Sequence, residues 1–479
     1  MTTAATLAPL VRPAERLRTS TPWWMGLFAG IAAFSGTGSA TLNGDELATI
    51  SAASRSLSGM FELARHIDGH FLPYYLFMHL WVQAGTAELW LRLPSAVAIG
   101  VAAWFLVDLG RRLHSVRAGV IGAAVFAILP SVSYYGAFAR SYAFAAAAVV
   151  FAFWALHRAV ERPTGRRWVV YGVAVALVCS THLFAVLVLP AQLLLMRRPV
   201  AVRMLAALVV GCVPAAVLGL IGFGERHAIS WVPQRGPEVW LKFPKMAAGA
   251  TTLGVVLFAM ALAGAVLLWR ARRDVHAFVL VGWLLLPPVL LLTVSQLVTP
   301  VYVDRYLFVT APALALLAGV AVACLPRFHV VAGVLVVALG CVLAFPDHVE
   351  VREENGRFEN IPWALRVIKA EPEDAIVYGQ SQLRSGFDYY ADSLMPVDVL
   401  RSGDSPDAEG FGYPERSDVS AELEGRKRVW VVWRGSKQSG LEGDSVPRVG
   451  EVERAGFELD VAKHSVDLPG LTVALFIRR

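Results

Sequence analysis

The sequence predicts a polytopic α-helical membrane protein with about eleven transmembrane helices and a small extracytoplasmic α/β domain at the C-terminal end. Of the 479 residues, 56% are hydrophobic and 17% are charged, whereas soluble domains carry about a quarter of charged residues. Long apolar segments alternate with short arginine-rich connections, and this pattern ends near residue 346. A lipid bilayer is therefore the expected solvent for most of the chain.

A transmembrane helix needs about 20 mainly apolar residues. The first 21 residues are polar and are predicted to be a cytoplasmic N-terminal tail, and the run that follows is read as a retained span because it has no convincing cleavage site. The eleven candidate spans are 22–40, 93–109, 118–134, 142–157, 168–184, 185–197, 204–222, 246–269, 277–294, 306–324 and 330–346. Residues 22–346 are thus predicted to form one membrane domain.

Arginines mark alternate connections, and the positive-inside rule makes those connections cytoplasmic. They are Arg12, Arg16 and Arg18; Arg111, Arg112 and Arg117; Arg158, Arg162, Arg166 and Arg167; Arg197, Arg198 and Arg203; Arg270, Arg272 and Arg273; and Arg327. The apolar stretch Phe71 to Val82 would break this alternation as a span. It is better interpreted as a helix at the outer interface, where tyrosine and tryptophan are favoured.

An odd number of spans places residues 347–479 outside the cytoplasm. Short apolar runs there predict strands at Ala375–Tyr378, Val429–Trp433 and Leu471–Ile477, and a helical pattern covers Trp363–Lys369. This segment is predicted to be a small α/β domain.

Charge and cysteine content exclude some functions. The net charge of +6 arises from the short basic clusters between apolar runs, so it reflects topology and does not indicate nucleic-acid binding. Cys179, Cys212, Cys324 and Cys341 all lie inside apolar stretches without CxxC spacing. Neither a disulfide framework nor a metal site is indicated by them.

Two adjacent carboxylates, Asp45 and Glu46, follow the first predicted span. A carboxylate at a low-dielectric boundary can serve as a general base toward a hydroxyl group. The alternative is that the acidic pair caps a helix predicted over Leu47 to Ser58.

Farther along the first external loop, His66, Asp68 and His70 precede Tyr74 and Tyr75. Two imidazoles and a carboxylate could bind a metal ion or a phosphate. Their spacing is not specific for a metal, and a solvated loop face is the commoner explanation of such residues.

The later external loops carry arginines among aromatic residues. Arg140 precedes Tyr142, and Arg305 lies between Asp304 and Tyr306. A guanidinium on this side suits a lipid-linked phosphate, which it can bind with two parallel hydrogen bonds. The alternatives are a snorkelling arginine at Arg140 and a local ion pair between Asp304 and Arg305.

Two further positions at span ends complete the candidates. His182 lies at the outer end of the fifth predicted span, where it could also make a helix-packing hydrogen bond. Asp108 lies at helical spacing from Arg111 and Arg112 on the cytoplasmic side and is interpreted as structural. An aromatic and charged loop between the seventh and eighth predicted spans could contact a substrate or rest on the lipid headgroups; its residues are Glu225, Arg226, His227, Trp231, Arg235 and Trp240.

The functional candidates share one predicted side of the membrane although they come from four separate loops or span ends; they are Asp45, Glu46, His70, Arg140, His182 and Arg305. Structural accidents would be distributed over both faces, whereas an outer carboxylate base combined with outer arginines fits a reaction on a substrate linked to a lipid phosphate.

The order of these motifs resembles the GT-C glycosyltransferases, specifically the bacterial RgtA/B/C/D-like branch related to ArnT and the protein mannosyltransferases. In that branch an Asp-Glu pair follows the first span, and an Asp-x-His-Pro-Pro-Leu-Tyr-Tyr element opens the interfacial helix; here Asp68-Gly69-His70-Phe71-Leu72-Pro73-Tyr74-Tyr75 stands there, without the proline pair. The likeness covers about residues 20 to 325. Its other motifs are Leu91-Arg92-Leu93-Pro94-Ser95-Ala96, Ala139-Arg140-Ser141-Tyr142, Thr181-His182-Leu183-Phe184 and Asp304-Arg305-Tyr306-Leu307.

The resemblance implies a polyprenyl-phosphate sugar donor and, commonly, transfer with inversion to an acceptor hydroxyl at the outer face. Asp45 would be the general base with Glu46 in support, and Arg140 and Arg305 would stabilise the departing polyprenyl phosphate. The substrate site would be shaped by Asp68, His70, Tyr74, Tyr142, His182 and Tyr306.

The same resemblance implies a bacterial plasma membrane protein of cell-envelope synthesis, with a glycan, glycolipid or protein as acceptor. Mannose is the expected sugar, with arabinose and galactose as alternatives. No cofactor is expected, since a monophosphate leaving group does not require a metal, although a divalent ion would be compatible with the chemistry. Two other classes remain open. A transporter or lipid flippase predicts buried mid-span charges and an inverted repeat, and a membrane sensor predicts a ligand site in the external domain.

Overall fold

The computed structural model of the protein describes residues 20–225, 232–271, 273–325, 327–392, 394–435, 446–465 and 470–479. Contacts within the chain divide it into two units. Unit 1 comprises residues 1–35 and 92–349, and unit 2 comprises residues 36–91 and 350–479. The candidate residues of the sequence fall into both units, so each unit is described by itself.

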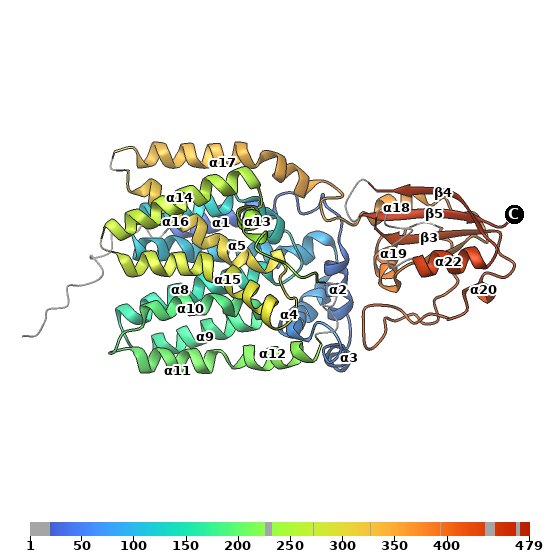
Figure 1. Ribbon diagram of the computed structural model, residues 1–479, viewed down its shortest axis with the longest axis horizontal. Coiled ribbons are helices and arrows are strands. Elements are labelled where there is room, and N and C mark those ends of the chain that lie inside the picture. The colour runs from blue at the N-terminus through green and yellow to red at the C-terminus, as the bar shows by residue number, and fades with distance from the viewer. Residues whose placement is uncertain are drawn as a thin grey trace, which may run out of the picture. The chain divides into compact units, whose positions relative to one another are not determined.

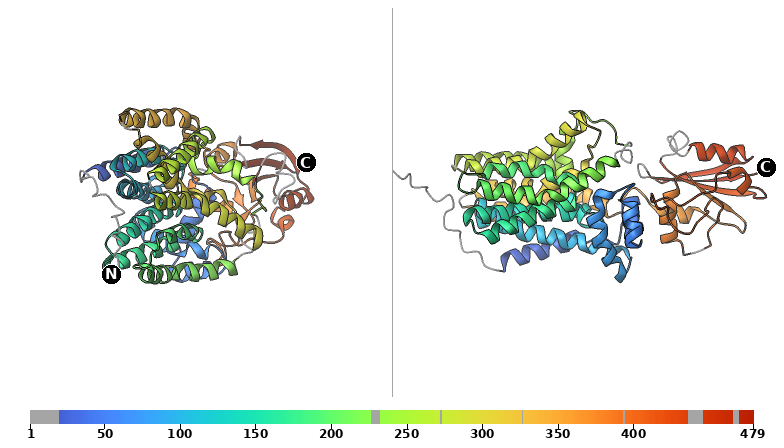
Figure 2. Two further views of the ribbon diagram at one scale, coloured as in Figure 1. Left: turned by 60° about the vertical axis from the view of Figure 1, so that its left-hand side comes forward. Right: turned by 90° about the horizontal axis from the view of Figure 1, so that it is seen from below.

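Unit 1 is a bundle of helices, many of which run alongside one another (Figures 1 and 2). Short 3₁₀ helices η3 (Leu183–Val188), η4 (Leu193–Leu195) and η6 (Asp304–Thr310) continue or precede its α-helices. The α-helices are α1 (Thr21–Phe34), α5 (Glu88–Leu113), α6 (Val116–Ala127), α7 (Pro130–Gly136), α8 (Tyr142–Glu161), α9 (Gly165–Thr181), α10 (Leu189–Gln192), α11 (Ala201–Gly211), α12 (Val213–Gly224), α13 (Val239–Ala248), α14 (Thr251–Arg270), α15 (Asp274–Leu297), α16 (Ala311–Ala323) and α17 (His329–Arg352).

The membrane character predicted from the sequence is confirmed, but the number of spans is not. Among the described residues, seven helices are long and apolar enough to cross a bilayer, or eight if the bent pair α6 and α7 is one span. Helix α1 has 14 residues, α9 has 17, and the apolar segment Leu183–Leu195 is also short. These elements account for the difference from the eleven spans predicted.

Helix α16 is the centre of unit 1, and twelve of its thirteen residues are buried. It packs against α6 and α14, and small residues allow the close approach. A methyl group added at Gly319 would lie 2.6 Å from the backbone nitrogen of Gly122 on α6. Such contacts between small residues are a common basis of helix association in membranes.

The predicted span 118–134 is bent in the structure. Helices α6 and α7 meet at 67°, with Pro130 as the first residue of α7. The residue before a proline is disfavoured in the helical region, and Leu129 is extended with ψ 133°. The bend redirects the chain just before the loop that carries Arg140.

The N-terminal part of unit 2 consists of short helices: α2 (Gly44–Ala53), α3 (Leu57–Leu63), η1 (Gly69–Phe71), α4 (Leu72–Trp81) and η2 (Val82–Ala84). The single helix predicted over Leu47 to Ser58 is wrong, because Ser56 starts a new helix by accepting a hydrogen bond from the Gly59 nitrogen (3.2 Å). The helix predicted over Phe71 to Val82 is present as α4. Its ten residues rise about 15 Å, which is too short to cross a bilayer.

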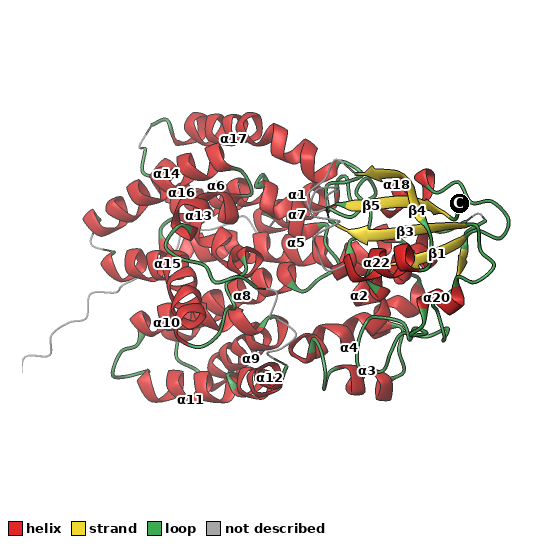
Figure 3. Cartoon of the chain, turned by 45° about the vertical axis from the view of Figure 1, so that its right-hand side comes forward, coloured by secondary structure: helices red, strands yellow, loops and turns green. Residues whose placement is uncertain are grey.

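The C-terminal part of unit 2 is an α/β domain (Figure 3). Its five-stranded sheet has the order β2-β1-β3-β5-β4, with β1 parallel to β2 and β3, and β5 antiparallel to β3 and β4. The three predicted strands are confirmed, and the predicted helix is α18. The elements are α18 (Ile361–Val367), β1 (Ala375–Tyr378), η7 (Ser381–Leu383), α19 (Arg384–Tyr390), β2 (Val397–Asp398), α20 (Val419–Glu422), β3 (Arg428–Arg434), α22 (Val446–Arg454), β4 (Glu458–His464) and β5 (Leu471–Ile477).

Candidate active site

The acidic pair lies in the first turn of α2, and its two carboxylates have different environments. Asn43 caps the helix, since its Oδ1 accepts a hydrogen bond from the Glu46 nitrogen (3.1 Å) and its own nitrogen donates to Glu46 Oε2 (3.4 Å). Glu46 is fully buried, whereas Asp45 is only partly buried. The capping interpretation therefore holds for Glu46, and the Asp45 carboxylate is not required for the cap.

The segment before α4 places Asp68 and Tyr75 in contact. The Tyr75 hydroxyl donates to Asp68 Oδ2 at 2.7 Å, and Asp68 has a left-handed backbone with φ 57°. The His70 ring packs on Phe71 with ring centres 4.2 Å apart, and Tyr74 is buried. The side chain of Asp68 thus fixes the entry to α4.

His66 lies apart from that arrangement. It pairs at the surface with Glu62 at 3.3 Å. Within the described parts of the chain, no group of three or more His, Cys, Asp or Glu side chains is arranged to hold a metal ion.

Two residues of the C-terminal domain lie next to the acidic pair, and sequence reasoning missed both. Arg434, at the end of β3, forms an ion pair with Glu359 at 2.8 Å. A methyl group added at Gly44 would lie 2.9 Å from Arg434 Nη2 and 3.2 Å from Glu359 Oε2, so the ion pair rests on the backbone directly before Asp45. No motif links these positions, because more than 300 residues separate them.

Burial raises the pKa of Glu359 above its ordinary value of 4.5; the Arg434 guanidinium opposes this rise, and the charge of Asp45 adds to it. The folded protein therefore ionises Glu359 less readily than the unfolded chain does. The ionisation of Glu359 has no effect on the free energy of unfolding well below pH 4.5, where the carboxyl group is protonated in both states. As the pH rises, the unfolded chain ionises first, so the free energy of unfolding decreases until the pH exceeds the pKa of the folded state.

Glu359→Gln should remove this cost, since an amide does not ionise. The melting temperature of the variant minus that of the wild type is expected to increase from about pH 4 to about pH 7. Thermal unfolding of the two purified proteins in the same detergent measures it. A difference that decreases with pH would mean that attraction to Arg434 outweighs burial.

In unit 1, three predicted site residues come together from distant parts of the chain. The His182 ring lies between Tyr142 and Tyr306, with ring centres 5.3 Å and 4.7 Å apart. All three side chains are at least nine-tenths buried. Each tyrosine belongs to a segment that carries an arginine: Arg140 lies two residues before Tyr142, and Arg305 directly precedes Tyr306.

The two arginines differ in burial. Arg140 is buried (4% exposed), and its backbone nitrogen donates to the Phe138 carbonyl at 2.8 Å. Arg305 is half-buried at the start of η6. Both therefore have restricted contact with water, which strengthens electrostatic attraction to an anion.

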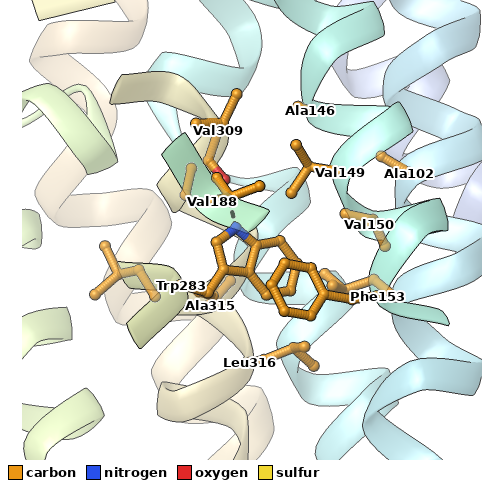
Figure 4. Packing of buried hydrophobic residues seen from close by; sticks show 14 of the residues in the cluster. Ala102, Ala146, Val149, Val150, Phe153, Val188, Trp283, Val309, Ala315 and Leu316 are labelled. Atoms are coloured by element: carbon orange, nitrogen blue, oxygen red, sulfur yellow. Dashed lines mark hydrogen bonds between the residues drawn. The ribbon is translucent and has the colours of Figure 1, made fainter. Parts of the chain in front are cut away.

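Trp283 on α15 lies in the apolar core of unit 1, among residues of α8, η6 and α16 (Figure 4). Its indole nitrogen donates to the Val309 carbonyl in η6 at 2.8 Å, and its ring stacks on Phe153 of α8 at 4.1 Å. The indole thereby links the helix that begins at Tyr142 to the 3₁₀ helix that contains Arg305 and Tyr306.

Other predictions have clear outcomes. Asp108 binds Arg111 Nε at 2.7 Å and Arg112 Nε at 2.8 Å, and it accepts from the Trp154 indole at 2.8 Å, which confirms its structural interpretation. Arg226, His227 and Trp231 lie outside the described residues.

The chain is similar to known proteins in part of its sequence and in its fold. The family model for dolichyl-phosphate-mannose-protein mannosyltransferases matches residues 73–223. The crystal structure of ArnT from Cupriavidus metallidurans bound to undecaprenyl phosphate is similar with a TM-score of 0.60 at 15% identity, covering 96% of this chain and 98% of that chain. Its apo state gives 0.59 at 15% identity, covering 94% and 97%. No curated protein matches the sequence.

The fold likeness therefore extends beyond residues 20–325, where the sequence motifs lie, to nearly the whole chain. It confirms the resemblance of the membrane helices to GT-C proteins.

Proposed function

We propose, from the premise that this chain is a membrane protein of the GT-C glycosyltransferase family, that it transfers a sugar from a polyprenyl-phosphate donor to an acceptor hydroxyl. Transfer would take place at the outer face of a bacterial plasma membrane, with the C-terminal domain on that side, and would serve cell-envelope synthesis. Mannose is the sugar we propose first, and no cofactor is required by the chemistry.

In this reaction the acceptor oxygen forms a bond to the anomeric carbon of the sugar, while the bond from that carbon to the phosphate oxygen breaks. The polyprenyl phosphate leaves with the electron pair, and the hydroxyl proton moves to the carboxylate of Asp45. Attack from the face opposite the leaving group inverts the anomeric configuration. Asp45 suits the role of base because its carboxylate is partly exposed while Glu46 is used in the helix cap.

The leaving group gains negative charge as the bond breaks, so fixed positive charge nearby lowers the barrier. We assign this role to Arg140 and Arg305, which flank the aromatic cluster of Tyr142, His182 and Tyr306. The cluster would restrict the two arginine-bearing segments, and Asp68, His70 and Tyr74 would shape the region around α4.

The observation that carries the proposal is the fold shared over 96% of the chain with ArnT in a structure bound to undecaprenyl phosphate. A donor screen tests it. The purified protein is mixed with polyprenyl-phosphate mannose, arabinose or galactose and with a membrane lipid and glycan extract, and mass spectrometry follows the products. We expect one donor to be consumed, with release of polyprenyl phosphate and a matching mass increase in an acceptor.

Failure to consume any of the donors, in a protein whose melting curve shows that it is folded, would contradict the proposal. It would favour a transporter or a sensor instead. Consumption of arabinose or galactose but not mannose would correct only the sugar.

A further inference from the structure

The C-terminal domain holds the segment that leads into α2 by several hydrogen bonds within unit 2. Thr41 Oγ1 donates to the carbonyl oxygen of Glu359 at 2.8 Å, and the Thr41 nitrogen donates to the Glu354 carbonyl at 3.0 Å. The Leu42 nitrogen donates to the Tyr390 hydroxyl oxygen at 2.7 Å. The backbone before Asp45 is therefore fixed by residues that follow it by more than 300 positions.

The ion pair of Glu359 and Arg434 is the last of these contacts before Asp45. It fills the space that a side chain at position 44 would occupy, as the 2.9 Å and 3.2 Å distances to an added methyl group show. The sheet restrains Arg434, because this residue ends β3 and its backbone nitrogen donates to Gln380 Oε1 at 3.1 Å. The Glu359 side chain is 11% exposed, so the pair is shielded from water on the carboxylate side.

The pair also places two opposite charges close to a carboxylate. Glu359 repels the charge of Asp45, and the Arg434 guanidinium attracts carboxylates at short range. Deletion of either member would remove a group that lies against the backbone at Gly44 and would leave the other charge without its partner.

We propose that Glu359 and Arg434 are positioning residues for Asp45, through which the C-terminal domain sets the orientation of the catalytic carboxylate. The inference rests on the proposed function, because it assigns the C-terminal domain a part in the sugar transfer. It requires no direct contact between this domain and the sugar.

Arg428 offers a matched control. It is the first residue of β3 as Arg434 is the last, it also pairs with carboxylates, Glu371 and Asp374, and its exposure is similar (27% against 31%). Arg434→Ala should lower kcat by about tenfold to a hundredfold with little change in KM for the donor, since small misplacement of a catalytic group has effects of this size. Arg428→Ala should retain the wild-type kcat.

A second measurement separates positioning from folding. Arg434→Lys keeps a positive charge beside Glu359 and should restore part of the kcat that Arg434→Ala loses, with KM for the donor at the wild-type value in both variants. Loss of folded protein alone would lower the yield of folded enzyme but not the kcat per folded molecule.

Gly44→Ala completes the test as a double-mutant cycle with Arg434→Ala. If the pair acts through its contact with Gly44, the two losses in kcat should not add. All variants are assayed as full-length protein with polyprenyl-phosphate mannose, arabinose or galactose, whichever the wild type consumes.

The outcomes separate the two proposals. An active wild type for which Arg434→Ala matches Arg428→Ala in kcat overturns the positioning role alone. Additive losses in the cycle likewise overturn the contact at Gly44. A folded wild type that consumes no donor overturns the proposed function and, with it, this inference.

Discussion

Asp45→Asn is expected to lower kcat for sugar transfer by about 10²- to 10⁴-fold, the range that a positioned general base contributes. The amide keeps the size of the carboxylate but cannot accept the hydroxyl proton. KM for the donor should change little, because the substitution removes an interaction made in the transition state. Release of polyprenyl phosphate, followed by mass spectrometry, measures the rate.

Folding should survive this substitution, since the cap of α2 depends on Asn43 and Glu46 and the side chain of Asp45 is partly exposed. Glu62→Gln is a suitable control in the same segment. Glu62 is an exposed carboxylate on α3 that pairs with Arg65 and His66, and surface ion pairs of this kind contribute little to the free energy of unfolding. Transfer by Asp45→Asn at the rate of Glu62→Gln would show that Asp45 is not the base.

Most of the fold is predictable from local sequence patterns, because membrane helices and buried strands need continuous apolar runs. Ala375–Tyr378 and Leu471–Ile477 were predicted with the bounds of β1 and β5, because short apolar runs with β-branched and aromatic residues in a polar domain favour a buried strand. Strand β4 was missed because its side chains are mostly exposed or half-buried, which leaves no apolar run to detect.

Capping decides where the prediction of α2 fails. The run from Leu47 to Ser58 reads as one helix by composition, yet the Ser56 side chain competes for a backbone nitrogen and begins α3. The bend at Pro130 has the same local origin and could have been predicted from the proline alone.

The candidate site was predictable only in part. Ionisable groups near a membrane are costly, and this rule found Arg140, His182 and Arg305 without any knowledge of the fold. The packing of His182 between Tyr142 and Tyr306 required the structure, since the three residues are far apart in the sequence. Glu359 and Arg434 gave no signal, because charged residues in a polar domain are ordinary until their neighbour is known.

Substitution of the two arginines should have the second largest effect on transfer. Arg305→Ala and Arg140→Ala are each expected to lower kcat by about 10²- to 10³-fold, as removal of a group that stabilises developing charge does in other enzymes. Lysine at either position restores the charge but not the planar pair of donors, so partial recovery is expected. A rise in KM at constant kcat would instead mean that the arginines only bind the donor.

Arg305 is the more decisive position, because it is half-buried and its loss should leave the bundle folded, whereas Arg140 is buried and its replacement risks misfolding. Arg273→Ala is the matched control. Arg273 is also half-buried and precedes a long helix, α15, but it donates to the Leu113 carbonyl at 2.7 Å, next to the Asp108 cluster. Equal activity of Arg305→Ala and Arg273→Ala would remove Arg305 from the leaving-group role. If only Arg305→Ala loses transfer activity and Arg305→Lys partly restores it, then transfer depends on a positive charge near the phosphate. Neither a transporter nor a sensor needs such a charge to break a bond.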